Sequence, residues 1–514
     1  MRKFNIVLAQ FGSLIGQHED KIKNYFRKNN TPEFYLYPES IVKIEDCVIA
    51  AGRNLFERFI LVISAHKNGL IGQFEGTVFD VDGVYVKLAD RNNDNINILK
   101  ARIPWLNPIS LKAFKTTIGC GDRIGLATPG HLLAIRNFDV APVLAQQSIR
   151  ELSLTGRTYR DVVNDAAFGV FQFGYRKGYG ADGDHLKTMK DIAIAVDEGM
   201  PMITLDLTDY LNVEALNYTY SEVINKFEKL SSDFKNRILT SYLSKKFILK
   251  SGVELNLNEE TLKRCALIYS AAIDFSFEVN SYLQNRRGSE FDLEISIDET
   301  SVPTLPEHHL YVIKELLYRN VIPSSIAPKF IGEFQKGIDY IGDVDEFEKQ
   351  FILHCDIAAT FGSYKISVHS GSDKFKIFSF IGKHTNGYFH LKTAGTSWLE
   401  ALRVISIEEP FLFYRIYKKA IETFPEALKL YHISSKLSDM PDIIGIQPQF
   451  YPELLENIYT RQLLHITYGY ILRCQSRGYY FFSAMHSFEN EYYYALKSHF
   501  TNHLNALKVS KQIK

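Results

Sequence analysis

The chain has 514 residues, of which 46% are hydrophobic and 23% charged. These proportions are typical of a globular enzyme and exclude a largely disordered protein. Lysine plus arginine and aspartate plus glutamate each number 59, and this balance argues against a nucleic-acid or anionic-membrane partner. Five scattered cysteines without a CxxC pair favour free thiols in a reducing cytoplasm. No stretch is long and apolar enough for a membrane helix.

Residues 1–115 predict an accessory α/β region. The basic start and apolar run at residues 4–11 also suit a signal peptide, but Gln10 interrupts the run, so we expect an ordinary first strand. Further strand-like runs occupy residues 59–65 and 76–90, and the latter contains Asp82–Gly83, a pair typical of two-residue hairpin turns. We find no pattern of catalytic residues in this region.

From about residue 116, short apolar runs alternate with helix-like segments. The runs are VAPVLAQQ, FGVFQFG, GYGADGDHL, MITLDLTDYL, DLEISIDE, SSIAPKF, YKISVHSG and YFHLKTAG. Such alternation predicts an α/β fold, and about eight units would close a (β/α)8 TIM-like barrel. An open doubly wound sheet is the alternative, although no GxGxxG motif follows the first strand. We place the barrel at residues 116–405, with a helical insertion at about 210–285 and a C-terminal helical cap at 406–514.

Polar side chains follow several of these strands. In a barrel, the carboxyl ends of the strands meet at one mouth, where active sites form. Alternation along DLEISID places Glu294, Ser296 and Asp298 on one face, directed into the barrel. The other candidates at strand ends are Asp182, Asp184, His185, Lys329, Glu333, Lys336, His369, Ser370, Ser372, Lys374, His390, Lys392, Thr393 and Thr396.

Imidazoles, carboxylates and lysines would thus share one mouth. Two histidines with one or two carboxylates suit a divalent cation such as Zn²⁺, Mn²⁺ or Ni²⁺. Lysines and hydroxyls suit a substrate that carries a carboxylate or phosphate. Each motif alone also allows a structural role: a helix cap for Asp184, a hydrogen-bonded His185, or an outward salt bridge for Glu294. Their co-occurrence indicates metal-assisted chemistry on an anionic sugar.

With these residues assembled, the chain resembles the tagaturonate epimerase family. The matching segments, within about residues 115–475, are GCGDRIGLATPGHLLA, residues 138–187, DLEISIDETSVPTLPEHH, APKFIGEFQKGIDYIGD, YKISVHSGSDKF, FHLKTAGTSWLEALRVIS and RQLLHITYGYIL. The first 115 residues match poorly. Two departures are visible: Gly183 stands where alanine is more usual, and Lys329 stands where we expect arginine.

The resemblance implies interconversion of two keto-hexuronates, tagaturonate and fructuronate, with a divalent metal. It implies that Asp184 and Glu294 are the acid/base pair and that His185 and His369 bind the metal. We add Glu333 as a further ligand on its position and chemistry. The expected substrate-binding residues are Ser148, Arg150, Glu151, Lys329, Ser370, Lys374, Lys392 and Thr393.

The inverted carbon of these substrates lies one bond beyond the carbon next to the ketone, so simple enolisation does not reach it. We therefore favour retro-aldol cleavage and re-addition, with Asp184 as base, Glu294 acting from the opposite side, and Lys374, Lys392 and Arg150 on the carboxylate. A metal-dependent aldolase, a ketose isomerase and a non-catalytic sugar-acid-binding barrel stay as alternatives. The expected partner is a small keto-hexuronate, and homo-oligomerisation is left open.

Overall fold

A computed structural model describes residues 16–298, 300 and 302–512. The predicted strand at residues 4–11 lies outside the described residues. Within that part of the chain, no helix has the length and apolar character needed to span a membrane.

The N-terminal region forms an antiparallel sheet in the order β1-β3-β4-β6-β5, with β2 paired to β3. Its strands are β1 (Tyr35–Leu36), β2 (Val42–Ile44), β3 (Cys47–Arg53), β4 (Arg58–Ser64), β5 (Gly76–Val81) and β6 (Val84–Asp90). The predicted hairpin is confirmed: Asp82 and Gly83 have φ of 52° and 83°, as a primed two-residue turn requires. The helices here are α2 (Glu19–Asn29), η1 (Pro38–Ser40), α3 (Leu70–Gln73), α4 (Asn93–Arg102) and η2 (Pro104–Leu106).

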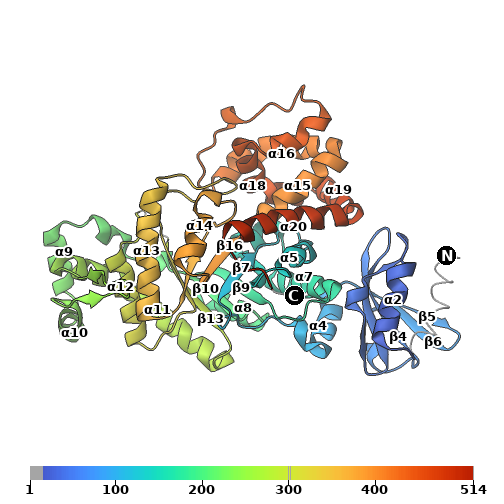
Figure 1. Cartoon of the computed structure of the whole chain (residues 1–514), viewed down its shortest axis with the longest axis horizontal. Helices are drawn as coiled ribbons and strands as arrows, with labels where there is room; N and C mark the ends of the chain where they lie inside the picture. The colour runs from blue at the N-terminus through green and yellow to red at the C-terminus, as the bar shows by residue number, and fades with distance from the viewer. Residues whose placement is uncertain (1–15, 299, 301, 513–514) are drawn as a thin grey trace.

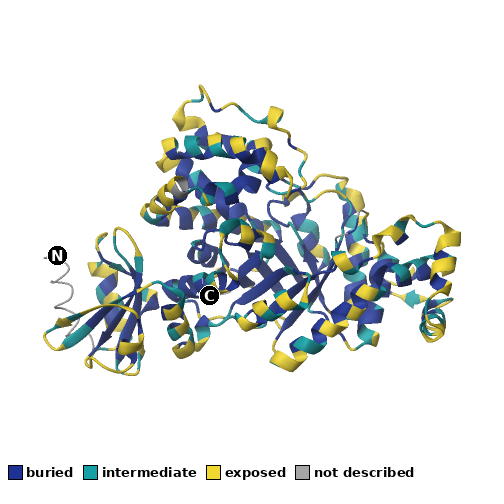
Figure 2. Ribbon diagram, turned by 180° about the vertical axis from the view of Figure 1, so that it is seen from behind, coloured by how far each residue is buried: buried dark blue, intermediate teal, exposed yellow. Residues whose placement is uncertain are grey.

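Eight parallel strands close into the predicted barrel, at the centre of the molecule (Figure 1). They are β7 (Thr116–Cys120), β8 (Ala141–Ser148), β9 (Gly180–Leu186), β10 (Met202–Asp206), β13 (Asp292–Ile297), β14 (Ser325–Pro328), β15 (Lys365–Val368) and β16 (Phe389–Thr393). Buried residues dominate these strands, whereas exposed residues gather on the outer helices (Figure 2).

The strand prediction contains one false and one missed strand, which leave the count at eight. FGVFQFG is the end of helix α7 (Tyr159–Phe173), and its apolar residues are buried around most of the helix. A short run that is apolar on all sides has no period that separates strand from helix. The missed strand is β7, whose five residues include two threonines and a glycine.

Helices surround the barrel, and their ends follow local capping chemistry. Gly156, in the left-handed conformation, ends α6 (Ile149–Thr155), and Thr158 starts α7 with a capping box to Asp161. These signals divide what the sequence presents as one helical run. The remaining barrel helices are α5 (Thr128–Ile135), α8 (Met189–Asp197), α11 (Glu259–Arg287), α12 (Pro306–Tyr318), α13 (Val344–Phe361), α14 (Phe375–His384) and α15 (Thr396–Glu408).

Two further helical parts flank the barrel. The first, between β10 and α11, lies on the side of the barrel away from the N-terminal sheet (Figure 1). Between β10 and α11 lie η3 (Thr208–Tyr210), η4 (Val213–Asn217), α9 (Tyr220–Glu228), α10 (Ser232–Tyr242), β11 (Phe247–Ile248) and β12 (Glu254–Leu255). The C-terminal part comprises α16 (Pro410–Leu428), η5 (Leu437–Asp439), η6 (Pro448–Phe450), α17 (Tyr451–Leu454), α18 (Ile458–Leu472), α19 (Gln475–Ser487) and α20 (Glu489–Ala506). It shares an apolar core with α15, and this core includes the buried Trp398.

Candidate active site

Strand β9 ends in an irregularity that turns two neighbouring side chains toward the mouth of the barrel. Its pairing with β10 shifts register after Gly183, and His185 has a left-handed φ of 58°. Regular alternation would direct Asp184 and His185 to opposite faces. Here His185 Nδ1 lies 2.8 Å from Asp184 Oδ1. A non-glycine residue in this conformation is strained, and such strain concentrates at functional sites.

The ammonium of Lys392 is the centre of the site. Its Nζ lies 2.8 Å from Asp182 Oδ2, 2.6 Å from Asp184 Oδ1 and 3.0 Å from Glu294 Oε1, and it donates to Thr204 Oγ1 at 2.5 Å. All of these side chains are buried. One cation therefore holds together three carboxylates from β9 and β13.

The carboxylates respond differently to this arrangement. Burial opposes ionisation, but His185 and Lys392 outweigh it and hold the pKa of Asp184 well below its usual value. Burial also opposes ionisation of Glu294, but Lys392 and His369 outweigh it and hold the pKa of Glu294 well below its usual value. Asp182 has less compensation, and burial raises its pKa to about 6. At neutral pH, Asp184 and Glu294 are both ionised and can accept protons.

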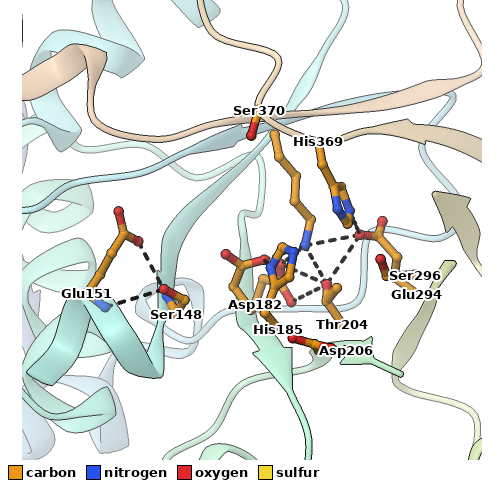
Figure 3. Close-up of polar contacts among 12 residues, drawn as sticks. Ser148, Glu151, Asp182, His185, Thr204, Asp206, Glu294, Ser296, His369 and Ser370 are labelled. Atoms are coloured by element: carbon orange, nitrogen blue, oxygen red, sulfur yellow. Dashed lines mark hydrogen bonds and ion pairs between the residues drawn. The ribbon is translucent and has the colours of Figure 1, made fainter. Parts of the chain in front are cut away.

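His369 bridges two carboxylates at the end of β15. Its Nε2 lies 2.7 Å from Glu294 Oε1 and its Nδ1 lies 3.0 Å from Asp298 Oδ2. Burial lowers the pKa of an imidazole, but Asp298 and Glu294 outweigh this and raise the pKa of His369 to about 10. The rings of His185 and His369 lie 4.9 Å apart between centroids. Figure 3 shows the imidazole of His369 directed at the carboxylate of Glu294.

A group of three side chains in this cluster fits a divalent cation. His185, Asp298 and His369 each offer a ligand atom, and these atoms lie within 4.8 Å of one another. Although Nδ1 of His369 is near Asp298, this buried atom makes no well-directed hydrogen bond within the described residues. Two imidazole nitrogens and a carboxylate suit zinc, manganese or nickel. The structure thus brings the two predicted imidazoles together.

Glu333, the predicted further ligand, lies elsewhere. It accepts a hydrogen bond from the amide of Gln335, its backbone pairs with that of Ile341, and it lines the outer cavity. Among the described residues, Asp298 rather than Glu333 completes the group with the imidazoles. The role of Glu333 as a metal ligand stays a prediction, and the geometry favours Asp298 in its place.

Part of the cluster lines an inner cavity of about 750 Å³, which adjoins an outer cavity of about 630 Å³. The cluster residues in its wall are Asp184, His185, Asp298, His369 and Lys392, whereas Glu294 is fully buried and does not line it. Both cavities share Arg150, Lys336 and Ser370 in their walls. Lys336 Nζ donates to Ser370 Oγ at 2.8 Å, and burial, followed by the charge of Arg150, lowers the pKa of Lys336 to about 8. The wall of the inner cavity therefore combines carboxylates and imidazoles with the cations Arg150 and Lys336.

Ser148 and Glu151, two predicted substrate-binding residues, make local contacts that start α6. They form a capping box, in which Glu151 N donates to Ser148 Oγ at 3.3 Å. Glu151 also pairs with Arg123 at 3.0 Å. Both residues line the cavity, to one side of the central cluster (Figure 3).

Three further predicted residues hold the backbone around the mouth. Lys374 Nζ donates to the carbonyls of residues 335, 338 and 372. Thr393 Oγ1 donates to the Gly119 carbonyl at 2.5 Å, and Lys329 Nζ donates to the Thr300 carbonyl. Their predicted substrate contacts stay predictions, and these bonds show a supporting role.

Several cavity residues were not predicted from the sequence. Gln146 and Asp206 stand at inward positions near the ends of β8 and β10 and line the cavity, so strand alternation could have identified them. Arg123 and His465 also line it. His465 comes from α18, and no local pattern connects a C-terminal helix with the barrel mouth.

Comparison with known proteins identifies the family. The sequence profile of the tagaturonate epimerase family matches residues 37–507. The chain is 37% identical over 508 residues to the tagaturonate/fructuronate epimerase of Thermotoga maritima, covering 98% of this chain and 100% of that protein. The chain belongs to the tagaturonate epimerase family.

Solved structures agree with this membership. The native fructuronate-tagaturonate epimerase of Cohnella laeviribosi superimposes with a TM-score of 0.88 at 39% identity, covering 96% of this chain and 99% of that one. A glycerol complex of the same epimerase gives 0.89 at 39% identity, covering 95% and 100%.

The family relationship extends further than the motif resemblance, which covered residues 115–475. The profile begins at residue 37 and ends at residue 507, so the tagaturonate epimerase family includes most of the N-terminal sheet as well. The poor match expected for the first 115 residues is wrong. Alternating apolar residues in an antiparallel sheet are common to many proteins, whereas the strand-end motifs of the barrel are distinctive.

Proposed function

We propose that this protein is an epimerase that interconverts tagaturonate and fructuronate with the help of a divalent cation. Full-length relatives at 37–39% identity carry that activity in their names. The arrangement that supports it most directly is the pair Asp184 and Glu294, both ionised and both held by Lys392; Asp184 and Lys392 line the inner cavity, and Glu294 is fully buried beside Lys392. Two proton acceptors joined by one ammonium suit a reaction that takes the proton of a hydroxyl on one side and supplies a proton to a new alkoxide on the other.

His185, Asp298 and His369 would hold the cation. When bound, it would supply Lewis-acid polarisation of the substrate ketone. The carboxylates of Asp184 and Glu294 lie outside this ligand group and stay available for proton transfer.

We propose retro-aldol chemistry in which Asp184 takes the proton of the hydroxyl on the inverting carbon. The bond between that carbon and its neighbour next to the ketone then breaks, leaving an aldehyde and an enediolate. After the aldehyde rotates, the bond re-forms on its other face and the new alkoxide needs a proton. Lys392 lies 2.6 Å from Asp184 and 3.0 Å from Glu294, so the proton can pass through Nζ to the second side. Atoms and charge balance over the cycle.

Metal-stripped protein, assayed by NMR with tagaturonate and with fructuronate while single ions are added back, tests the activity. We expect epimer formation in both directions only after addition of a cation. His384, which pairs with Glu348 and lines neither cavity, offers a control, since H384Q should retain the metal-dependent rate while H369Q should lose it. Accumulation of three-carbon products would indicate an aldolase, and conversion to an aldose would indicate an isomerase; either would refute the proposal.

Deuterated solvent tests the mechanism. Retro-aldol cleavage leaves the hydrogen on the inverting carbon in place, so epimer formed in D2O should contain no deuterium there. Deuterium incorporation at the rate of epimerisation would refute the mechanism but not the activity. Both D184N and E294Q should lose at least about 100-fold in kcat, the usual contribution of a proton-transfer group. Unchanged turnover would refute the assigned roles.

A further inference from the structure

Two cations, Lys336 and Arg150, line both the inner and the outer cavity. We infer that Lys336 and Arg150 form the subsite that binds the carboxylate of the substrate and thereby selects sugar acids over neutral sugars. This inference rests on the proposed function, because it names the part of the cavity that recognises the acid end of a keto-hexuronate.

The other cavity cations already have partners. Lys392 contacts three carboxylates, Arg123 pairs with Glu151 at 3.0 Å, and Lys374 donates to three backbone carbonyls. An ammonium enclosed by carboxylates has little capacity for another anion. These contacts argue against Lys374 and Lys392 as the carboxylate ligands that the sequence suggested.

Lys336 and Arg150 make no ion pair within the described part of the chain. Lys336 Nζ donates to Ser370 Oγ. Arg150 Nη1 donates to the Leu430 carbonyl at 3.1 Å, and its guanidinium lies 4.6 Å from the centre of the Tyr431 ring. Stacking holds the guanidinium in place without neutralising it. Two cations beside each other in a cavity repel, and an anion between them would relieve this cost.

Ser370 adds a third donor at the same place. Its Oγ accepts the hydrogen bond from Lys336, so its hydroxyl hydrogen can point to a carboxylate oxygen. Ser370 also has a left-handed φ of 49°, which a non-glycine residue adopts at a cost. The strained backbone places this side chain against Lys336 at the entrance shared by the two cavities.

The groups around Lys336 include both cations and carboxylates. The charged or titratable groups whose fields reach it are Arg123, Arg150, Glu151, Asp184, Lys374 and His465. In a keto-hexuronate, the ketone and the carboxylate lie toward opposite ends of the carbon chain. A substrate with its ketone at the imidazoles and its inverting carbon at Asp184 therefore directs its carboxylate to Lys336 and Arg150.

Kinetics with tagaturonate and with tagatose, its neutral counterpart, test the subsite. We expect K336M and R150M each to raise KM for tagaturonate about 10- to 100-fold, the loss of one charge-assisted hydrogen bond, with KM for tagatose changed less than about twofold. K336R should recover most of the affinity. The exposed Lys349, paired only with Glu346, offers a control, and K349M should match the wild type. An equal rise in KM for both sugars, or an unchanged KM for tagaturonate, would overturn the inference.

Calorimetric titration of the metal-loaded protein with tagaturonate separates this inference from the proposed function. Wild type that binds tagaturonate but never forms fructuronate refutes the activity, and weaker binding by K336M would then still support the subsite. Epimerisation by the wild type together with unchanged binding by K336M and R150M overturns the subsite and leaves the activity intact. Thermal melting of each variant excludes misfolding, which is not expected for Lys336 because it lies in a loop between β14 and α13.

Discussion

Replacement of Lys392 with methionine is expected to destabilise the protein by about 4 kcal/mol at pH 7.5. The ammonium lies within 3.0 Å of Asp182, Asp184 and Glu294, all of them buried. Removing one partner of a buried ion pair costs about 3–5 kcal/mol, because the other charge stays buried without compensation. Methionine has nearly the length of lysine, so packing changes little.

The loss of stability in K392M should become smaller as the pH falls. Burial raises the pKa of Asp182 to about 6 in the wild type, and Lys392 opposes this rise; without Lys392, burial and the charges of Asp184 and Glu294 raise the pKa of Asp182 further above the unfolded value. The folded variant then binds more protons than the unfolded chain, and its stability rises toward acid pH. One carboxylate protonated only in the folded state recovers about 2.7 kcal/mol between pH 7.5 and 5.5, at 1.36 kcal/mol per unit.

Urea denaturation of chelator-treated protein at pH 7.5 and 5.5 measures this effect. Lys365 provides the matched control: it is equally buried in the barrel, donates to Leu111 O and Thr117 Oγ1, and forms no ion pair among the described residues. Burial lowers the pKa of Lys365 to about 8, so K365M should change stability by less than about 1 kcal/mol. The reasoning would be refuted if K392M and K365M lost the same free energy of unfolding, or if the loss in K392M were as large at pH 5.5 as at pH 7.5.

Three shorter predictions concern the site. D298N should retain at least about tenfold less metal after gel filtration, measured by plasma mass spectrometry, whereas E333Q should retain it; the reverse result would support Glu333 as the ligand. The kcat/KM for tagaturonate should fall above about pH 8, because Lys336 has its pKa lowered to about 8 by burial and loses its charge there, and K336R should remove this fall; a fall that persists in K336R contradicts the assignment. G119A should lower kcat/KM for tagaturonate. The added Cβ would lie 1.6 Å from Gln146 Oε1 and would displace the Gln146 side chain from the cavity wall. If G119A had wild-type kinetics, Gln146 would not contact the substrate.

The sequence by itself determined the barrel and most of the polar residues at its mouth. Strand–helix alternation follows from burial on both faces of a parallel sheet, and polar residues after apolar strands must gather at one end. Glu294 and Ser296 lie in the interior as alternation predicts, and both are fully buried. The hairpin at Asp82–Gly83 follows from the local backbone preferences of two residues.

Only the tertiary structure decided which of these residues act together. Lys392 joins Asp182 across 210 positions of sequence, and its electrostatic role depends on distances that no local pattern contains. His185 shares the mouth with Asp184 because β9 departs from regular pairing, whereas alternation directs it away. The lack of an ion pair at Lys336 and Arg150 becomes visible only once the described cations around the cavity are seen with their partners. Local propensity and periodicity place residues on elements, but charge compensation and burial are properties of the packed chain.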